Sequence, residues 1–178
     1  MTVLVSGASK YGSTMGIAVW IAKVLSESGI AVDLQPIAKV TDPASYDAYV
    51  IGGATYMGSW LSDAADFVRR NAPTLASRPT WLFCSVPLGT SQIDAKGRDV
   101  IVSAEPKEFA NFRHWLRPNA TQIFFGSMDY SRLRGKDRLV RHLPSANEML
   151  PEGDFRDWPA IEAWAAGISS ALAGTRTS

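Results

Sequence analysis

The segment Ser9–Thr14 combines hydroxyl side chains with a glycine at the start of an expected helix. Ser9, Ser13 and Thr14 each carry a hydroxyl, and Gly12 lets the chain turn tightly. A helix start also offers unpaired backbone N–H groups and the positive end of the helix dipole, which together favour phosphate binding. The same residue types are favoured helix caps, so a simple capped turn is the alternative interpretation. This loop is the first candidate for chemistry.

The spacing within this loop disfavours two nucleotide-binding motifs. Gly7 and Gly12 stand where a P-loop has its glycines, but Ser13 stands where that motif needs the lysine that binds the outer phosphates. The Gly-x-Gly-x-x-Gly fingerprint of dinucleotide-binding folds is also missing after the preceding apolar run. The loop therefore favours a mononucleotide phosphate.

Few other side chains are candidates for chemistry of their own. Cys84 is the single cysteine, which excludes an intrachain disulfide, and two histidines are too few for the usual zinc-binding clusters. Cys84 is interpreted as a buried strand residue, and His114 and His142 as surface or packing residues. No acid–base pair stands out, so the catalytic residues stay unknown and no metal is expected. That absence is compatible with a reaction driven by a bound cofactor.

Two further segments are candidates for contact with a partner. Leu88–Glu105 is long and lacks a periodic pattern, as in a functional lid or in a tolerated surface insertion. A later segment interleaves cations with apolar residues and is opposed only by Asp137. It is interpreted either as a surface for anionic lipid or substrate carboxylates, or as a solvated helix face. Its cations are Arg132, Arg134, Lys136, Arg138 and Arg141.

Composition and charge narrow the class of protein. The 18 Lys and Arg residues nearly balance the 17 Asp and Glu residues, which disfavours a nucleic-acid-binding protein. No run of about 18 apolar residues predicts a membrane span, and no basic stretch precedes the apolar run Val3–Val5, as a secretory signal would require. We expect a cytoplasmic protein with peripheral membrane contact as an option, and the sequence does not predict an oligomeric state.

The elements that would position these residues alternate between strands and helices. Short apolar runs predict strands, and apolar residues at helical spacing predict helices. The predicted strands are Thr2–Ser6, Ile30–Pro36, Asp47–Ile51, Thr80–Val86 and Thr121–Phe125. The predicted helices are Ser13–Ser28, Trp60–Asn71, Pro106–Leu116 and Pro159–Ala173. This alternation predicts an α/β fold, with a doubly wound parallel sheet of five strands and helices on both faces.

The predicted sheet also indicates where a ligand would bind. In such sheets ligands lie beyond the carboxyl ends of the strands, at the point where the strand order reverses. The loops Gly7–Thr14, Gly52–Trp60 and Val86–Glu105 are therefore expected to surround the site.

Several segments resemble a known family. Ala8–Thr14 resembles the phosphate loop of the flavodoxin superfamily, and Tyr46–Trp60 resembles its third strand and flavin loop. Three more segments resemble the branch of menaquinone-dependent protoporphyrinogen dehydrogenases, namely Phe67–Asn71, Trp81–Gly89 and Phe125–Tyr130. The likeness covers nearly the whole chain and implies one flavodoxin-like domain over residues 1–174, with a short tail at 175–178. The segment Leu143–Trp158 departs from the porphyrinogen-oxidising members.

The resemblance implies FMN held by three loops. The first would bind the phosphate, the second would flank the isoalloxazine ring, and the third would form its other wall. Trp60 would either shield the ring or pack on the next helix. A deazaflavin, which also carries a phosphate and a tricyclic ring, stays open as the alternative cofactor. The implied cofactor-binding residues are Ser9, Lys10, Tyr11, Gly12, Ser13 and Thr14, then Ala54, Thr55, Tyr56 and Met57, then Ser85, Val86, Pro87, Leu88 and Gly89.

Two functions fit these implications. One is an FMN-dependent oxidoreductase that passes electrons from a small reduced substrate, such as a porphyrinogen, to a quinone. The other is a flavodoxin-type electron carrier without a substrate of its own. Such carriers are acidic and dock on basic partner surfaces, whereas this chain is nearly neutral and its densest charge run is basic. The charge balance therefore favours the oxidoreductase.

Overall fold

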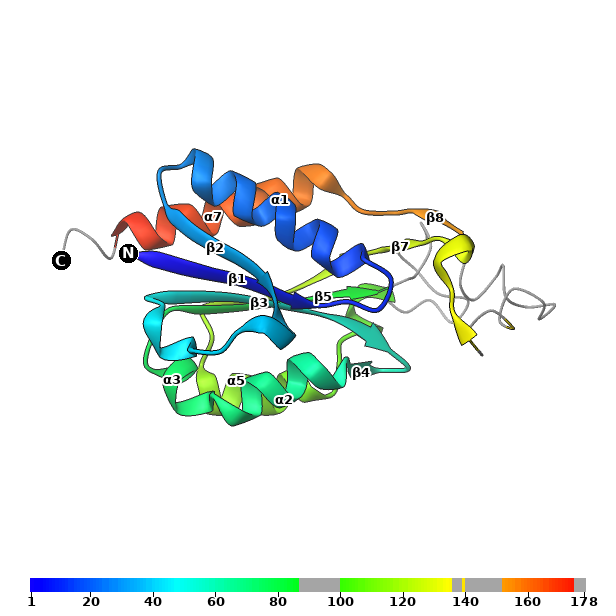
Figure 1. The fold of residues 1–178 in the computed structure, drawn as a ribbon, viewed down its shortest axis with the longest axis horizontal. Coiled ribbons are helices and arrows are strands. Elements are labelled where there is room, and N and C mark those ends of the chain that lie inside the picture. The colour runs from blue at the N-terminus through cyan, green and yellow to red at the C-terminus, as the bar shows by residue number, and fades with distance from the viewer. Residues whose placement is uncertain (87–99, 136–138, 140–151, 175–178) are drawn as a thin grey trace.

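A parallel sheet forms the centre of the molecule. The computed structural model describes residues 1–86, 100–135, 139 and 152–174. Its parallel strands lie in the order β2-β1-β3-β5-β6, which confirms the predicted five-stranded parallel sheet. Figure 1 shows the sheet between two layers of helices. They are β1 (Thr2–Ala8), β2 (Ala31–Pro36), β3 (Ala48–Tyr56), β5 (Thr80–Val86) and β6 (Ala120–Phe125). A sixth strand, β4 (Ser59–Trp60), pairs antiparallel with β3.

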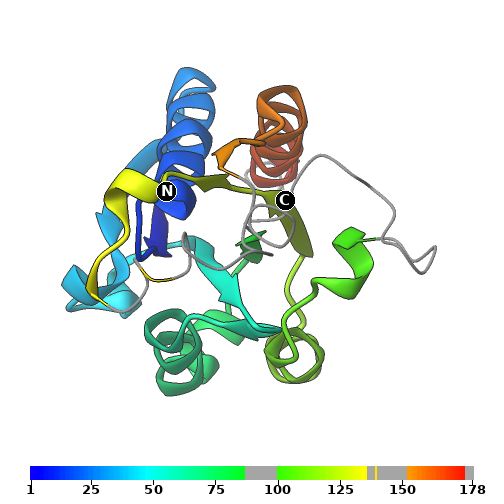
Figure 2. The same ribbon diagram turned by 90° about the vertical axis from the view of Figure 1, so that its right-hand side faces the viewer.

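Helices cover both faces of this sheet. Figure 2 shows α1 (Ser13–Glu27) and α7 (Trp158–Gly174) side by side on one face. The other face carries α2 (Ser62–Arg70), α3 (Ala72–Ala76) and α5 (Glu108–Leu116). The shorter elements are η1 (Ile37–Lys39), η2 (Pro43–Ser45), α4 (Val100–Ser103) and η3 (Tyr130–Arg132), with a small antiparallel pair of β7 (Ser127–Met128) and β8 (Gly153–Asp154).

Side chains alternate along the strands between two apolar cores. In β1, Val3 and Val5 pack with α1 and α7, whereas Leu4 packs with α2 and α5. In β5, Phe83 enters the first core and Leu82 the second. A sheet buried on both faces requires such continuous apolar strands. The helix residues predicted to face the core from α1 are all buried: Ile17, Ala18, Ile21, Ala22 and Leu25.

Some boundaries differ from the prediction, because pairing between strands overrides local signals. The third strand does not end at Gly52 and Gly53 but continues to Tyr56, since β5 pairs alongside both glycines. Trp60, predicted as the first residue of a helix, lies in β4 opposite Thr55, and the helix begins at Ser62. Elements such as β4, β7 and β8 have two residues each, too few to produce a periodic pattern.

The strand order defines one switch point. From β1 the chain winds outward to β2 on one side, and from β3 it winds through β5 to β6 on the other. The carboxyl ends of β1 and β3 therefore lie next to each other where the winding reverses, which is where such sheets bind ligands. Figure 2 looks onto this edge of the sheet. The loops that follow β1 and β3 flank the switch point, as predicted.

Candidate functional site

The loop between β1 and α1 makes a tight turn. Gly12 precedes the first residue of α1 and has a φ of 93°, a left-handed conformation that glycine adopts without steric cost. Its N–H donates to the Ser9 hydroxyl oxygen over 2.9 Å, which closes the turn. No side chain caps the start of α1 by a hydrogen bond. The helix start is thus presented to the carboxyl edge by a glycine turn, as phosphate binding requires.

The two hydroxyls that open α1 connect the loop to other strands. The Ser13 hydroxyl oxygen accepts a hydrogen bond of 2.8 Å from the backbone N–H of Ser127. The Thr14 hydroxyl shares a buried hydrogen bond of 2.7 Å with the Ser85 hydroxyl at the end of β5. These bonds join the start of α1 to the end of β5 and to the segment after β6, so Ser13, Thr14 and Ser85 have structural partners within the chain.

Gly126 makes this close approach possible. A β-carbon at this position would lie 2.8 Å from the Ser13 hydroxyl oxygen and 3.2 Å from the backbone oxygen of Val86. Its N–H donates to Val86 O over 2.7 Å, and its carbonyl accepts from the N–H of Phe155 over 3.0 Å. The site therefore depends on a glycine that sequence reasoning missed. Its position directly after a predicted strand was the available signal.

The loop after β3 is a two-residue hairpin. Met57 and Gly58 have φ angles of 49° and 73°, positive at both positions as in a type I′ turn. The carbonyl of Gly58 accepts a hydrogen bond of 3.0 Å from the N–H of Lys107, which fixes the hairpin to the segment before α5. The Met57 side chain is fully exposed at the tip, whereas Ala54 and Thr55 are buried.

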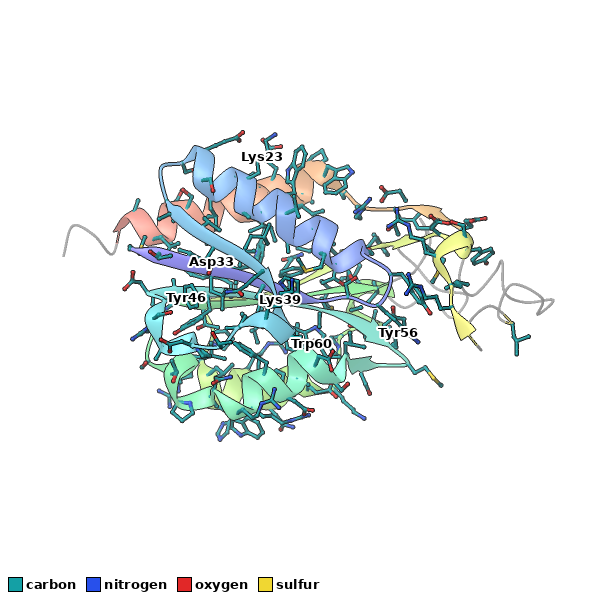
Figure 3. The ribbon with its side chains drawn as sticks, in the orientation of Figure 1. Lys23, Asp33, Lys39, Tyr46, Tyr56 and Trp60 are labelled. Carbon is teal, nitrogen blue, oxygen red and sulfur yellow. The ribbon has the colours of Figure 1, made fainter. Side chains whose placement is uncertain are left out.

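Aromatic rings from the first two loops meet around one cation. The ammonium nitrogen of Lys10 lies 5.6 Å from the centroid of the Tyr11 ring and 5.9 Å from that of Tyr56. Cations within about 6 Å of a ring face are attracted by its electrons. Figure 3 shows Tyr56 toward the end of the molecule to which the strands point. The structure thus brings together three of the residues predicted to surround a flavin.

Trp60 is a packing residue and does not face the carboxyl edge. It is 3% exposed, its indole N–H donates to Gly53 O over 2.9 Å, and its backbone N–H donates to the buried Glu108 carboxylate over 2.9 Å. Its ring meets that of Phe109 edge-on, with centroids 5.3 Å apart. In Figure 3 it lies between the sheet and the lower helices. Of the two interpretations of Trp60, the structure supports packing on a helix.

The described residues line three cavities along this edge. A small one of about 20 Å³ is lined by residues at the ends of four strands, β1, β3, β5 and β6: Ser9, Tyr11, Ser13, Ala54, Tyr56, Ser85, Gly126, Ser127 and Met128. A second, of about 350 Å³, is lined by Tyr11, Gly12, Ser127, Met128, Asp129, Arg132, Glu152, Gly153, Asp154 and Arg156. A third, of about 470 Å³, is lined by Lys10, Tyr11, Gly12, Ser131, Arg132, Leu133 and Arg134. The two larger cavities have the volume of small-molecule sites, roughly 300–1,000 Å³.

An ion pair between Arg156 and Asp154 lies in the lining of the cavity of about 350 Å³. Arg156 binds the Asp154 carboxylate at 2.5 Å, and this hydrogen bond is the main cause that lowers the pKa of Asp154. The Arg156 guanidinium also lies 4.5 Å from the ring centroid of Trp158. Sequence reasoning missed Asp154 and Arg156, because they come from a segment more than a hundred residues after the loop that they adjoin.

Part of the predicted site lies outside the described residues. Pro87, Leu88 and Gly89 are not described. Of the segment Leu88–Glu105, only residues 100–105 are described. Of the five clustered cations, Arg132 and Arg134 are described and exposed, whereas Lys136, Arg138 and Arg141 are not described.

In the described part of the chain, no group of three or more His, Cys, Asp or Glu side chains could hold a metal ion. No helix there is long and apolar enough to cross a bilayer.

Cys84 is expected to be inert toward thiol reagents in the folded protein. The side chain is fully buried in β5, and burial raises the pKa of its thiol to about 12, from an ordinary value of 9.0. Because the thiolate is the nucleophile, labelling by a disulfide reagent at pH 8 should be at least about a hundredfold slower in the native protein than in urea. The raised pKa also means that the thiol favours the folded state below pH 9, a contribution lost as the pH rises through 12. Rapid native labelling would contradict this buried position.

The sequence is similar to a known protein family and to a curated protein. A family model described as "Flavodoxin domain" matches residues 4–146. The protoporphyrinogen IX dehydrogenase [quinone] of Escherichia coli (strain K12) is 27% identical over 176 residues, covering 95% of each chain.

Solved structures of flavodoxins are similar in fold. A flavodoxin from the domain Archaea matches with a TM-score of 0.59 and 13% identity, and a mutant of a flavodoxin from Pseudomonas aeruginosa matches with a TM-score of 0.61 and 15% identity. In both comparisons 97% of this chain and 99% of the other are covered. The rubredoxin oxygen:oxidoreductase of Desulfovibrio gigas matches with a TM-score of 0.59 and 13% identity, over 99% of this chain and 37% of the other.

Proposed function

Because the chain belongs to the flavodoxin domain family, we propose that it is an FMN-dependent oxidoreductase that passes electrons from a small reduced substrate to a quinone. The name of its Escherichia coli relative supports this reaction class and makes a porphyrinogen the first candidate substrate. The observation that carries the proposal is the glycine turn at Gly12, which presents the uncapped start of α1 at the switch point of the sheet.

The side chains around this turn fit a phosphate-bearing flavin. The start of α1 favours an anion, and Lys10 adds a positive charge beside it. The rings of Tyr11 and Tyr56 offer flat apolar surfaces on which an aromatic ring system stacks. Bound FMN would supply the electron and hydride transfer, while these residues would hold and orient it. The hydrogen bonds of Ser13, Thr14 and Ser85 would keep the start of α1 and the end of β5 in place during turnover.

The charge distribution favours an enzyme over a carrier. Lys10, Arg132 and Arg134 line one cavity at the carboxyl edge, and the whole chain has a formal charge of +1. A carrier that docks on basic partner surfaces would need the opposite sign at this edge. The exposed Arg132 and Arg134 further support peripheral contact with an anionic membrane, where a quinone would be available, and a cytoplasmic location.

Titration with FMN tests the cofactor. The purified protein should bind one equivalent of FMN and quench its fluorescence, and a deazaflavin should bind more weakly or not at all. If the deazaflavin binds and FMN does not, the cofactor assignment is wrong but the site stands. If neither binds, the turn at Gly12 is only a structural turn and the proposal fails.

Reoxidation of the reduced, FMN-loaded protein tests the acceptor. Menaquinone in vesicles should rapidly restore the absorbance spectrum of the oxidised flavin. Anionic vesicles should give a higher reoxidation rate than zwitterionic ones. A flavodoxin-type carrier would instead be reoxidised by a redox protein and would react slowly with menaquinone in both kinds of vesicle.

A further inference from the structure

We propose that Arg132 is an additional ligand for the cofactor phosphate, supplied by the segment that follows β6. This inference rests on the proposed function and deepens it. The phosphate loop Ser9–Thr14 itself contains one cation, Lys10. Arg132 lies 120 residues after Gly12 in the sequence, so its position beside the loop is a property of the fold.

Arg132 reaches Gly12, the residue directly before the helix. Its Nη1 lies 3.3 Å from the position that a β-carbon on Gly12 would take, so the guanidinium occupies the space beside the turn that a side chain at Gly12 would need. Gly12 is also the residue whose carbonyl begins the hydrogen bonding of α1, because it accepts from the N–H of Gly16 over 2.9 Å. The guanidinium therefore lies beside the residue that precedes the helix, and the amides of a helix start favour an anion.

Asp129 holds the guanidinium in this orientation. Its carboxylate accepts hydrogen bonds from the N–H of Ser131 at 2.9 Å, from the Ser131 hydroxyl at 2.5 Å and from Nε of Arg132 at 3.1 Å. The hydrogen bond from the Ser131 hydroxyl is the main cause that lowers the pKa of Asp129, so the carboxylate stays charged at a more acidic pH than an ordinary aspartate would. An exposed Arg–Asp pair stabilises a fold very little. Its effect here is to orient the guanidinium and so reduce the ordering cost of binding.

The surrounding charges favour an anion on one side of Arg132. Tyr11, Gly12 and Arg132 form the wall shared by the cavities of about 350 and 470 Å³. The smaller of these two is also lined by three carboxylates and Arg156, so its charges oppose one another. The larger has Lys10, Arg132 and Arg134 in its described lining and no carboxylate there. A phosphate at Gly12 that faces the larger cavity would meet three cations.

The chemistry of the group matches this arrangement. A guanidinium presents parallel N–H donors that pair with two oxygens of a phosphate, and such charge-assisted hydrogen bonds are about twice as strong as neutral ones. Nε is engaged by Asp129, and Nη1 is the nitrogen that lies beside the turn. Arg132 would thus add a charged contact to a phosphate that the loop binds through backbone amides.

Paired titrations with FMN and riboflavin test this role, because riboflavin has the same ring system and lacks the phosphate. Fluorescence quenching should show that Arg132→Met weakens FMN binding by about tenfold, or about 1.4 kcal/mol, and leaves riboflavin affinity within about twofold of wild type. The difference between FMN and riboflavin should also become less dependent on salt in the variant, since one charge pair is lost.

Arg69→Met is the matched control. Arg69 forms the same kind of exposed ion pair with an aspartate three residues earlier, Asp66 on α2, at 2.8 Å. It should leave both affinities unchanged. Equal losses for FMN and riboflavin in Arg132→Met, or no loss for either, would overturn the role of Arg132 while FMN binding by the wild type still upheld the proposed function. A wild-type protein that binds no FMN would instead contradict the proposed function itself.

Discussion

Replacing Gly52 with alanine is expected to destabilise the fold by about 3 kcal/mol, at the upper end of what overpacked cores lose. The new β-carbon would lie 2.1 Å from Cζ of Phe83 and 2.5 Å from both of its Cε atoms. Phe83 is fully buried and meets Phe124 and Trp164, with ring centroids 6.1 and 6.0 Å away, so its ring has no free space to enter. Thermal unfolding followed by circular dichroism should show a Tm lower by about 6–12 °C for a chain of this size.

A second glycine provides the control for this prediction. Gly167 lies within α7, and a β-carbon there would meet nothing within 4 Å. Gly167→Ala should therefore raise stability by about 0.5–1 kcal/mol, because alanine loses less backbone entropy in a helix. Combining Gly52→Ala with Phe83→Leu should cost less than the sum of the two changes, since the smaller side chain makes room. Stability unchanged by Gly52→Ala alone would show that β3 and β5 are not packed as described.

Gly126→Ala is expected to weaken FMN binding by at least about tenfold, which is about 1.4 kcal/mol. The added methyl group would press on the Ser13 hydroxyl at 2.8 Å. The backbone of Gly126 cannot simply retreat, because Val86 and Phe155 hold its N–H and its carbonyl. Ser13 would have to leave its hydrogen bond from Ser127, and the first turn of α1 would shift with it. Fluorescence titration with FMN measures the loss.

The Ser13 hydroxyl identifies the cause of that loss. Ser13→Ala removes the atom that the new methyl group would meet, so the double variant should be more stable than the sum of the single changes predicts. Its FMN affinity should stay below that of the wild type if the Ser13–Ser127 hydrogen bond positions the loop. Wild-type affinity in Gly126→Ala would mean that the edge of the sheet is not part of the binding site.

Buried strands and amphipathic helices were the most predictable part of this fold. Thr80–Val86 was predicted with the bounds that the structure shows, because the continuous apolar run Trp81–Cys84 forms its centre, and all seven of its residues are buried. The end of β3 was predicted wrongly at Gly52 and Gly53. Glycine is a strand breaker by local preference, but here the ring of Phe83 requires the absence of a side chain.

The candidate site was predictable only where one loop contains it. The turn at Gly12 and the hydroxyls beside it are adjacent in the sequence, and the structure places them at the switch point. The partners Ser127, Asp129 and Arg132 reach that turn through the tertiary fold, and no local spacing indicates a contact between Ser13 and a residue 114 positions later. Trp60 is similar, because its role depends on Glu108, which lies 48 positions away.

The hydrogen bond between Ser13 and Ser127 has a consequence for biosynthesis. Translation delivers the turn at Gly12 early, but its partner at the end of β6 leaves the ribosome only after 114 more residues have been added. At roughly 5–20 residues per second this delay lasts about 6–23 s. A nascent chain that contains only β1 to β5 has both apolar cores incomplete and lacks one side of the carboxyl edge of the sheet. If FMN binds as proposed, we therefore expect its loading to come late in the life of each newly made chain, after the early stages of folding.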